Sequence, residues 1–405
     1  MPSEKIIYIY TASYPYTPIN DIFIRDELKI ASNIGYKIIL VPVRKGSQRD
    51  KFPNNIIVDE SICGGIKSKI FSVVKTFFST GELSIWNCVL YDKAFRFKYL
   101  KFGIRYIYAA NLVYTHLEKY ASKSEPAVFY GYWMYYTPIA FAYYKFKHPL
   151  SQHRFICRGH GTDVYTTKLG VYVPKRQFMF THIDSIFTVS KFGCLYLRNK
   201  YPEFSFKVQI SRLGVVRPIR EIKKVPGCLT VVSCASVIKI KRIRLLFDSL
   251  NFYVKDTNKE IVWHHFGGGN LLEEIKKYSK SICDNKLKIC FHGNVPNKEI
   301  VDFYSKNELY AFISVSESEG VPVSMMEAIS CGIPIISTDV GGCSEIVTKE
   351  TGVLIPKDFK QREFNDGLSY LFENYSNLSL SALDFYNHNY DAEKNYSDFY
   401  EVITK

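Results

Sequence analysis

Short apolar, β-branched runs alternate with helical patterns along the chain, and this alternation constrains the fold more than any other feature. The runs are Ile6–Tyr10, Ile38–Val41, Val128–Tyr130, Leu229–Val232, Ile261–Trp263 and Ile333–Ile336. Strands that alternate with helices are joined by crossover connections, and they form parallel sheets with helices on both faces. The pattern therefore predicts an α/β fold made of doubly wound domains.

The chain is long enough for two such domains. It has 405 residues, whereas a single hydrophobic core seldom serves more than about 250 to 300. Between the two groups of runs lies a segment with two prolines and several charges that interrupts the periodicity and is typical of a linker. We expect an N-terminal domain over 1–215, a linker over 216–227, a C-terminal domain over 228–386, and a last helix over 387–405 that packs back on the N-terminal domain.

Composition and cysteine usage indicate a soluble globular protein with reduced thiols. Hydrophobic residues make up 47% and charged residues 23%, and the mean hydropathy is -0.09. The ten cysteines form no C-x-x-C pair and no cluster with histidines at zinc-ligand spacing, so we expect no metal site. The first residues lack the basic and long apolar regions of an export signal, and this predicts a cytoplasmic location.

The net charge of +14 favours anionic partners. Part of the excess positive charge lies between Lys67 and Arg105. In this segment lysines and arginines are interspersed with phenylalanines, and acidic residues are few. Such a mixture suits peripheral contact with an anionic membrane surface. It equally suits solvated amphipathic helices whose aromatic residues pack inward. No nucleic-acid-binding motif accompanies the basic residues, so we expect no nucleic acid as partner.

The most informative segment is residues 316–328, which follow the strand-like run Tyr310–Ile313. The segment combines a glycine turn with the start of a helix. Proline fits the first helical turn, and Pro322 occupies that place, so the free amides around Val321 to Ser324 predict an anion site.

Two carboxylates flank these amides. Glu319 lies in the turn, and Glu327 lies about one and a half turns into the helix. Carboxylates bind vicinal hydroxyls, and helix amides bind phosphates, so the arrangement suits a nucleotide diphosphate sugar. Taken alone, the two glutamates could equally be a helix-dipole partner and a surface residue.

The continuation over 329–347, a helix that ends at Gly332 and a buried strand, makes the segment closely similar to family 4 glycosyltransferases. Such a resemblance implies the GT-B fold, in which two Rossmann-like domains face each other across a cleft. In that family a Glu, seven residues and a second Glu form the donor site. By resemblance, Glu319 binds hydroxyls of the transferred sugar and Glu327 the ribose. The resemblance also implies that the diphosphate binds to main-chain amides in the segment formed by Gly320, Val321, Pro322 and Val323.

Residues 232–242 resemble a second part of the family's donor site, where an Arg and, five residues later, a Lys neutralise the diphosphate. Lys241 matches the lysine, but Ser236 replaces the arginine. Arg242 is our candidate for the missing charge. The segment 291–296 resembles the loop whose backbone contacts the base, with Val295 at the contacting position.

In the N-terminal half, residues 158–163 resemble the family's His-Gly-x-Asp turn. The resemblance implies that His160 touches the transferred sugar or the acceptor. A turn histidine held by Asp163 is the alternative. The segments 11–27 and 130–134 resemble acceptor-facing loops of polysaccharide-assembling members. We therefore assign four residues to the acceptor side, with Tyr132 and Trp133 alternatively in the core: Tyr16, Asp163, Tyr132 and Trp133.

The resemblance implies retaining, metal-independent hexosyl transfer, in which Lys241 and helix amides meet the charge of the leaving group. No D-x-D motif occurs. We expect no cofactor, since the nucleotide sugar is a substrate. The expected acceptor is a glycan or a polyprenyl-diphosphate-linked saccharide in surface polysaccharide synthesis, and the protein is expected in the cytoplasm or peripherally on the inner membrane face. Two alternatives stay open: a non-catalytic nucleotide-binding assembly protein of the same fold, which Ser236 favours, and a GT-B nucleotide-sugar epimerase.

Overall fold

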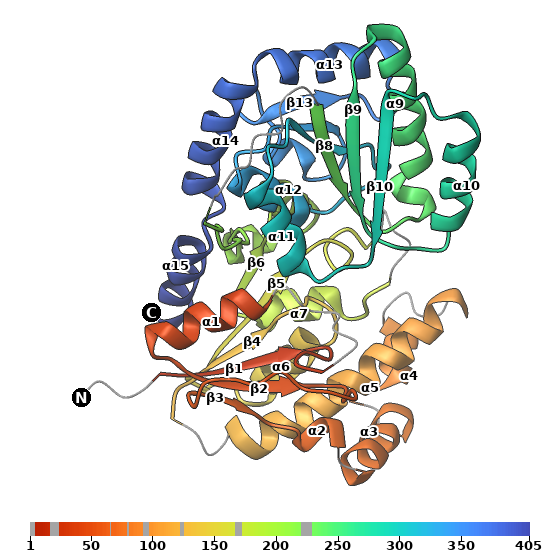
Figure 1. Cartoon of the computed structure of the whole chain (residues 1–405). Helices are drawn as coiled ribbons and strands as arrows, with labels where there is room; N and C mark the ends of the chain where they lie inside the picture. The colour runs from red at the N-terminus through yellow and green to blue at the C-terminus, as the bar shows by residue number, and fades with distance from the viewer. Residues whose placement is uncertain are drawn as a thin grey trace. The chain divides into compact units, whose positions relative to one another are not determined.

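The chain divides into two compact units in the computed structural model (Figure 1). The first unit comprises Met1–Arg212 and Lys394–Lys405, and the second comprises Leu213–Glu393. The structure describes residues 5–16, 24–64, 66–78, 81–91, 97–121, 125–166, 172–219 and 229–405.

The first unit is built on a seven-stranded parallel sheet with the order β3-β2-β1-β4-β5-β6-β7. Its strands are β1 (Ile6–Thr11), β2 (Lys37–Pro42), β3 (Ile56–Val58), β4 (Val128–Gly131), β5 (Arg154–Gly159), β6 (Ser185–Thr188) and β7 (Val208–Ile210). The strand order reverses between β1 and β4. In open α/β sheets, ligands bind beyond the carboxyl ends of the strands, near such a switch point.

Helices cover both faces of this sheet. The helices of the unit are α1 (Ile24–Ile34), α2 (Ser61–Gly64), α3 (Ile66–Phe78), α4 (Ile85–Tyr91), α5 (Phe97–Tyr120), α6 (Thr137–Lys147), α7 (Arg176–His182), α8 (Lys191–Lys200), the 3-10 helix η3 (Pro202–Lys207) and α15 (Ala392–Thr404). Buried residues of α5, α6, α7 and α8 form the core on one face, and those of α1 and α15 form the core on the other.

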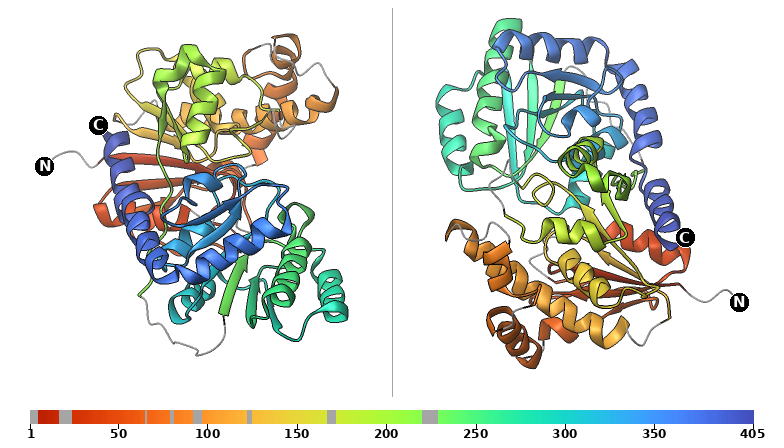
Figure 2. Two further views of the ribbon diagram at one scale, coloured as in Figure 1. Left: turned by 90° about the horizontal axis from the view of Figure 1, so that it is seen from above. Right: turned by 180° about the vertical axis from the view of Figure 1, so that it is seen from behind.

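A buried ion pair ties β5 and the last helix to α1. Arg158 Nη1 donates to Glu27 Oε2 at 2.7 Å, and both side chains are fully buried. Tyr400 of α15 donates from Oη to the second oxygen of Glu27 at 3.3 Å. The two views of Figure 2 show α15, in dark blue, beside α1, in red.

The second unit has a six-stranded parallel sheet with the order β10-β9-β8-β11-β12-β13. Its strands are β8 (Leu229–Cys234), β9 (Ile261–Phe266), β10 (Leu287–Gly293), β11 (Ala311–Ser314), β12 (Ile335–Thr338) and β13 (Gly352–Ile355). Its helices are η4 (Lys239–Lys241), α9 (Ile243–Thr257), α10 (Leu272–Ile282), α11 (Asn297–Lys306), α12 (Val323–Ser330), η5 (Cys343–Glu345), α13 (Gln361–Glu373) and α14 (Tyr375–Asn389). Buried residues of α9, α10, α13 and α14 form a core with the sheet. The two parallel α/β sheets that the sequence predicts are thus confirmed.

The described residues of the basic aromatic segment lie mainly in α3, α4 and α5. Several large apolar side chains of α3 and α4 point outward rather than into the core. The exposed ones are Ile70, Phe71, Val73, Val74, Phe78 and Trp86. By contrast, Phe102 and Tyr106 of α5 pack against the core. No helix in the described ranges combines the length and the apolar character needed to cross a membrane.

Candidate active site

Lys241 and Glu319 form an ion pair at the carboxyl end of the second sheet. Lys241 ends η4, which follows β8, and Glu319 lies in the loop after β11. Lys241 Nζ donates to both carboxylate oxygens of Glu319, each at 2.6 Å. Their side chains are 22% and 10% exposed. The pair forms because β8 and β11 are neighbours in the sheet, so that the loops after them meet.

Main-chain contacts fix the loop that carries Glu319. Glu317 N donates to Ile240 O at 2.8 Å, and Thr338 Oγ1 donates to Ser316 O at 2.7 Å. Ile240 lies in η4 after β8, and Thr338 is the last residue of β12; both strands are neighbours of β11. The loop therefore holds Glu319 in place before any ligand binds.

A pair of glycines after β12 supports the same loop. Gly342 N donates to Gly320 O at 2.7 Å. Gly341 has a φ of +57°, and a Cβ added there would lie 2.0 Å from Glu319 O. Only glycine fits such a close approach in the left-handed region. Sequence reasoning did not assign these glycines to the site, although two adjacent glycines that follow a buried strand after two residues could have indicated a tight turn there.

The start of α12 presents amides without partners. Pro322 is the N-cap residue, with an extended ψ of 110°, so α12 begins at Val323 and the proline precedes the first helical turn that the sequence predicts for it. Among the described residues, none accepts a hydrogen bond from the main-chain N–H of Val321 or Ser324. Free amides at a helix N-terminus attract phosphate.

Glu327 of α12 is nearly buried, with 7% exposure. Asn297 Nδ2 donates to Glu327 Oε1 at 2.7 Å. Asn297 is the first residue of α11 and directly follows the loop that contains Val295, which is partly buried. The contact therefore connects the predicted ribose ligand to the predicted base-binding loop. Sequence reasoning missed Asn297, because no local pattern links two residues on different helices.

Glycines let the loops after β8, β9 and β10 pack closely. Gly267 has a φ of +135°, and a Cβ there would lie 2.0 Å from Ala235 O. Val237 N donates to Gly268 O at 2.8 Å, and Gly268 N donates to Asn294 Oδ1 at 2.7 Å. These contacts hold the loop that contains Val237 against the two loops beside it.

The guanidinium of Arg242 donates hydrogen bonds to main-chain carbonyl oxygens. Nε donates to Val315 O at 2.5 Å, and Nη2 donates to Lys357 O at 2.9 Å. Arg242 thus clamps the start of the Glu319 loop. Its predicted contact with a diphosphate stays a prediction. Ser236 is exposed on the loop after β8.

In the first unit, His160 follows β5 with both ring nitrogens buried and without a hydrogen-bond partner. Its ring contacts Tyr132 and Trp133, with centroid distances of 4.7 and 4.5 Å. Nδ1 lies 3.9 Å from Asp163 Oδ2, beyond hydrogen-bond reach. A buried imidazole without a partner is costly unless a ligand satisfies it.

Asp163 holds the turn around His160 through its carboxylate. Oδ1 accepts from the main-chain nitrogens of His160 and Gly161 at 2.8 and 2.9 Å, and Oδ2 accepts from Met134 N at 2.9 Å. Burial would raise the pKa of Asp163, but the interactions with His160 and these amides outweigh burial and lower it. Asp163 therefore stays charged and joins the loops after β4 and β5.

The four predicted acceptor-side residues differ in accessibility. Tyr16, Tyr132 and Asp163 are buried, whereas Trp133 is partly exposed. Tyr16 donates from its hydroxyl to Glu60. Only Trp133 of the four is accessible to an acceptor in this structure, and Tyr132 and Asp163 can act only by positioning His160.

Histidine pairs elsewhere do not make a metal centre. His264 Nδ1 and His292 Nε2 lie 2.9 Å apart, and burial is the main cause that lowers both pKa values, that of His264 to about 4. The described part of the chain contains no group of three or more His, Cys, Asp or Glu side chains that could hold a metal ion.

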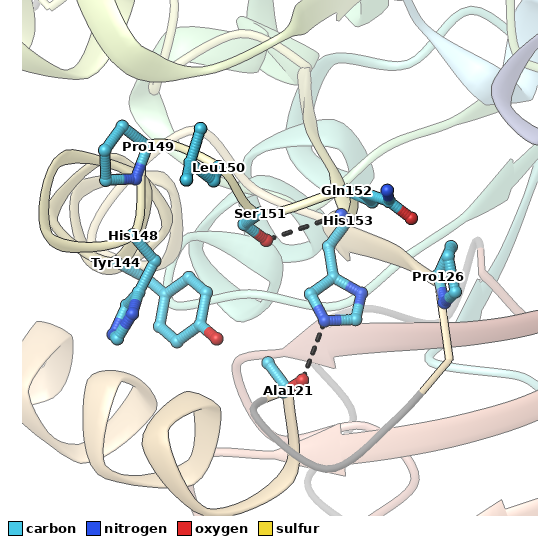
Figure 3. A pocket seen from close by; sticks show the side chains of 9 residues that line it. All are labelled: Ala121, Pro126, Tyr144, His148, Pro149, Leu150, Ser151, Gln152 and His153. Carbon is cyan, nitrogen blue, oxygen red and sulfur yellow. Dashed lines mark hydrogen bonds between the residues drawn. The ribbon is translucent and has the colours of Figure 1, made fainter.

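A pocket of about 520 Å³ surrounds His153 (Figure 3). His153 Nε2 donates to Ala121 O at 2.7 Å, and Nδ1 accepts from Ala127 N at 3.1 Å. Both ring nitrogens are thus used inside the protein. The pocket lies before Arg154, at the amino end of β5, and so opposite to the end where parallel sheets bind ligands.

Part of the chain matches a family of known proteins. Residues 219–383 match the family model described as "Glycosyl transferases group 1". The O-antigen biosynthesis glycosyltransferase WbnH of Escherichia coli is 36% identical over 120 residues, which cover 30% of this chain and 32% of WbnH. The putative colanic acid biosynthesis glycosyltransferase WcaL of Salmonella typhimurium is 25% identical over 213 residues, 50% of this chain and 51% of WcaL. The matched part therefore spans about a third of WbnH and about half of WcaL.

Solved structures resemble the whole chain. A glycosyltransferase from Rickettsia africae superposes with a TM-score of 0.66 over 99% of this chain and 98% of that chain, at 14% identity. Anabaena Alr3699/HepE in complex with UDP superposes with a TM-score of 0.63 over 99% of both chains, at 12% identity. The chain therefore has the GT-B fold, and residues 219–383, less than half of it, resemble the glycosyl transferases group 1 family.

Proposed function

We propose that the protein is a retaining hexosyltransferase of family 4 that moves a sugar from a nucleotide diphosphate sugar to a saccharide acceptor in surface polysaccharide synthesis. The observation that carries the proposal is the ion pair between Lys241 and Glu319 beside the free amides of α12. The names of WbnH and WcaL, which refer to O-antigen and colanic acid, support the polymer class. The UDP held by HepE supports a nucleotide-linked donor.

The proposed reaction needs neither a metal ion nor a cofactor. The acceptor hydroxyl attacks the anomeric carbon on the face from which the nucleotide diphosphate departs, and the leaving phosphate takes the hydroxyl proton. Lys241 and the N–H groups of Val321 and Ser324 stabilise the charge that develops on the diphosphate. When the diphosphate takes Lys241, Glu319 loses its cation and turns to the hydroxyls of the transferred sugar. Glu327 binds the ribose, and the main chain at Val295 binds the base.

His160 is the residue of the first unit that we assign to contact with the sugars. Its unpartnered ring nitrogens can donate to or accept from a hydroxyl. Trp133, which packs on the ring at 4.5 Å, offers an apolar face to a sugar ring. The buried Tyr132 and Asp163 hold this arrangement in place.

We also propose that the enzyme is cytoplasmic and binds the anionic inner face of the membrane peripherally. The exposed Phe71, Val74 and Phe78 of α3, with Lys69 and Lys75 on the same helix, support this placement. We expect the protein to co-sediment with anionic vesicles at low salt and a Phe71→Ser/Phe78→Ser variant to stay in the supernatant. Equal sedimentation of both proteins would reject this use of α3.

Titration of the purified protein with UDP-, GDP- and ADP-sugars, followed by thermal unfolding, tests the donor site. A ligand at 100 times its Kd stabilises the folded protein by about 2.7 kcal/mol. We expect one base to shift the melting temperature selectively, and Glu327→Ala to abolish the shift. Transfer to an acceptor extract then separates the enzyme from a non-catalytic binding protein, which Ser236 favours and which would bind without turnover. Absence of any shift would reject the proposed function.

A further inference from the structure

A basic pocket in the first unit is not used by the donor site. Its volume is about 440 Å³. Four cationic residues line it together with apolar ones. The lining residues are Val43, Arg44, Lys45, Cys63, Lys69, Arg105, Tyr108, Ala109, Leu112 and Tyr136. The apolar members Cys63, Ala109 and Leu112 are buried, so the pocket has an apolar floor under a cationic rim.

The cations of this pocket are poorly neutralised by the protein. Lys45 Nζ pairs with Glu60 Oε2 at 2.6 Å, and Glu60 is shared with Arg49 at 3.2 Å. No described residue forms an ion pair with Arg44, Lys69 or Arg105 (side-chain N to carboxylate O within 4.0 Å). Cations that converge on one concavity repel each other and concentrate anions there. Guanidinium and ammonium groups together suit a phosphoryl group, which arginine binds in a bidentate manner.

The basic pocket lies at the same edge of the sheet as His160. Val43, Arg44 and Lys45 directly follow β2, and Tyr136 caps α6, which follows β4. The strand order separates β2 from β5 by three strand spacings, which corresponds to about 14 Å.

A series of ring contacts connects the basic pocket with His160. Tyr136 contacts Tyr106 at a centroid distance of 6.3 Å, and Tyr106 stacks on Tyr135 at 5.5 Å. Tyr135 stacks on Trp133 at 5.9 Å, and Trp133 contacts His160 at 4.5 Å. A row of aromatic rings thus leads from the pocket to the predicted sugar contact. Tyr106 is buried, but the other three rings are partly exposed, and exposed aromatic rings suit the apolar faces of sugars.

The basic pocket also borders the exposed apolar surface of α3. Lys69 lines the pocket, and Val73, one turn further along the same face of α3, is an exposed large apolar side chain. A molecule with a saccharide at one end, a phosphoryl group in the middle and an apolar chain at the other end would match this order of surfaces. The saccharide would extend toward His160, and the apolar chain would lie along α3.

We infer that the basic pocket binds the phosphoryl group that joins the acceptor saccharide to its carrier. The inference rests on the proposed function and names a subsite for it. The shared chemistry is a phosphate or diphosphate ester, and the position beside α3 favours a lipid carrier over a soluble one.

Binding of farnesyl diphosphate, measured by calorimetry at low salt, tests this subsite, with pyrophosphate and farnesol as comparison ligands. We expect Arg44→Gln/Arg105→Gln to weaken farnesyl diphosphate binding at least tenfold. Lys29→Gln, which removes an exposed cation of α1 on the opposite face of the sheet, should leave it unchanged. Tighter binding of farnesyl diphosphate than of pyrophosphate supports a lipid carrier, and equal binding supports a soluble phosphorylated acceptor.

Farnesol binding as tightly as farnesyl diphosphate, or equal affinity in the double variant and the unchanged protein, would overturn the inference. The same variants are titrated with the nucleotide sugar that stabilises the protein. If the double variant keeps both the donor-induced thermal shift and the farnesyl diphosphate affinity of the unchanged protein, the subsite alone is rejected. If no nucleotide sugar shifts the melting temperature of the unchanged protein, the proposed function is rejected instead.

Discussion

Lys241 holds Glu319 through both carboxylate oxygens, each 2.6 Å from the ammonium group. The two residues are 78 positions apart in the chain. Glu319 is only 10% exposed, so its charge interacts with Lys241 through little solvent. The ion pair keeps both groups oriented, and in the proposed reaction a diphosphate competes for the lysine.

Replacement of either residue is expected to lower kcat about 100-fold, because each variant removes stabilisation of the transition state. Lys241→Met and Glu319→Gln are the appropriate changes, since they keep the size of the side chains. Residues that act as a unit have non-additive effects, so the double variant should be no slower than the slower single variant. Steady-state kinetics with the selected donor measure this. If the fold-reductions in kcat of the two single variants multiplied in the double variant, the two residues would act independently.

Glu327→Ala is expected to raise the donor KM at least tenfold, which corresponds to about 1.4 kcal/mol. The reason is that the variant loses the carboxylate that we propose binds the ribose hydroxyls. Asn297→Ala should raise the same KM by a smaller factor, because Asn297 orients Glu327 through a 2.7 Å hydrogen bond. Asn307→Ala is the matched control, since Asn307 lies after the other end of α11 and donates to Phe303 O at 2.8 Å. An equal effect of both asparagine variants would contradict the positioning role.

Gly341→Ala is expected to reduce kcat/KM at least tenfold, because the new Cβ would lie 2.0 Å from Glu319 O and displace the loop. Gly35→Ala provides the control. Gly35 also has a positive φ, of +97°, but a Cβ there would meet nothing within 4 Å. Both variants pay about 1 kcal/mol of backbone strain, so thermal unfolding should be affected in both. Activity measured at a temperature where both are folded should fall only in Gly341→Ala.

The sequence predicted the architecture well because strand positions depend on local patterns. The run Leu229–Val232 begins β8, and Ile261–Trp263 begins β9. In contrast, the predicted run Ile333–Ile336 overlaps β12 only from Ile335. Pro334 precedes this strand and accepts from Phe312 N, and proline has no N–H of its own to donate to the ladder.

The candidate site was only partly predictable. The spacing of Glu319 and Glu327 is local, and so is the turn at His160. The ion pair of Lys241 with Glu319 depends on which strands are neighbours, and strand order is not a local property of the sequence. The contact between Asn297 and Glu327 likewise depends on how α11 packs on α12.

His265 links stability to pH through its burial. Its side chain is fully buried, and Nδ1 lies 2.8 Å from Ser233 Oγ. Burial is the largest cause that lowers the pKa of His265, to about 4. An unfolded histidine has a pKa of about 6.5. Above that pH both states are neutral, and His265 contributes no pH dependence.

As the pH falls from about 6.5 to about 4, the unfolded chain binds a proton at position 265 and the folded protein does not. The free energy of unfolding should therefore decrease, by at most about 1.4 kcal/mol per pH unit from this residue. Below about pH 4 the loss stops, because both states are protonated. Urea unfolding at pH 7.5, 6 and 5 measures the effect, with His265→Gln as the comparison. At pH 7.5 the variant should be less stable than the unchanged protein, because the substitution removes the contact with Ser233. On acidification, however, the urea midpoint of the variant should fall less. Parallel pH profiles for the two proteins would show that His265 titrates normally in the folded state.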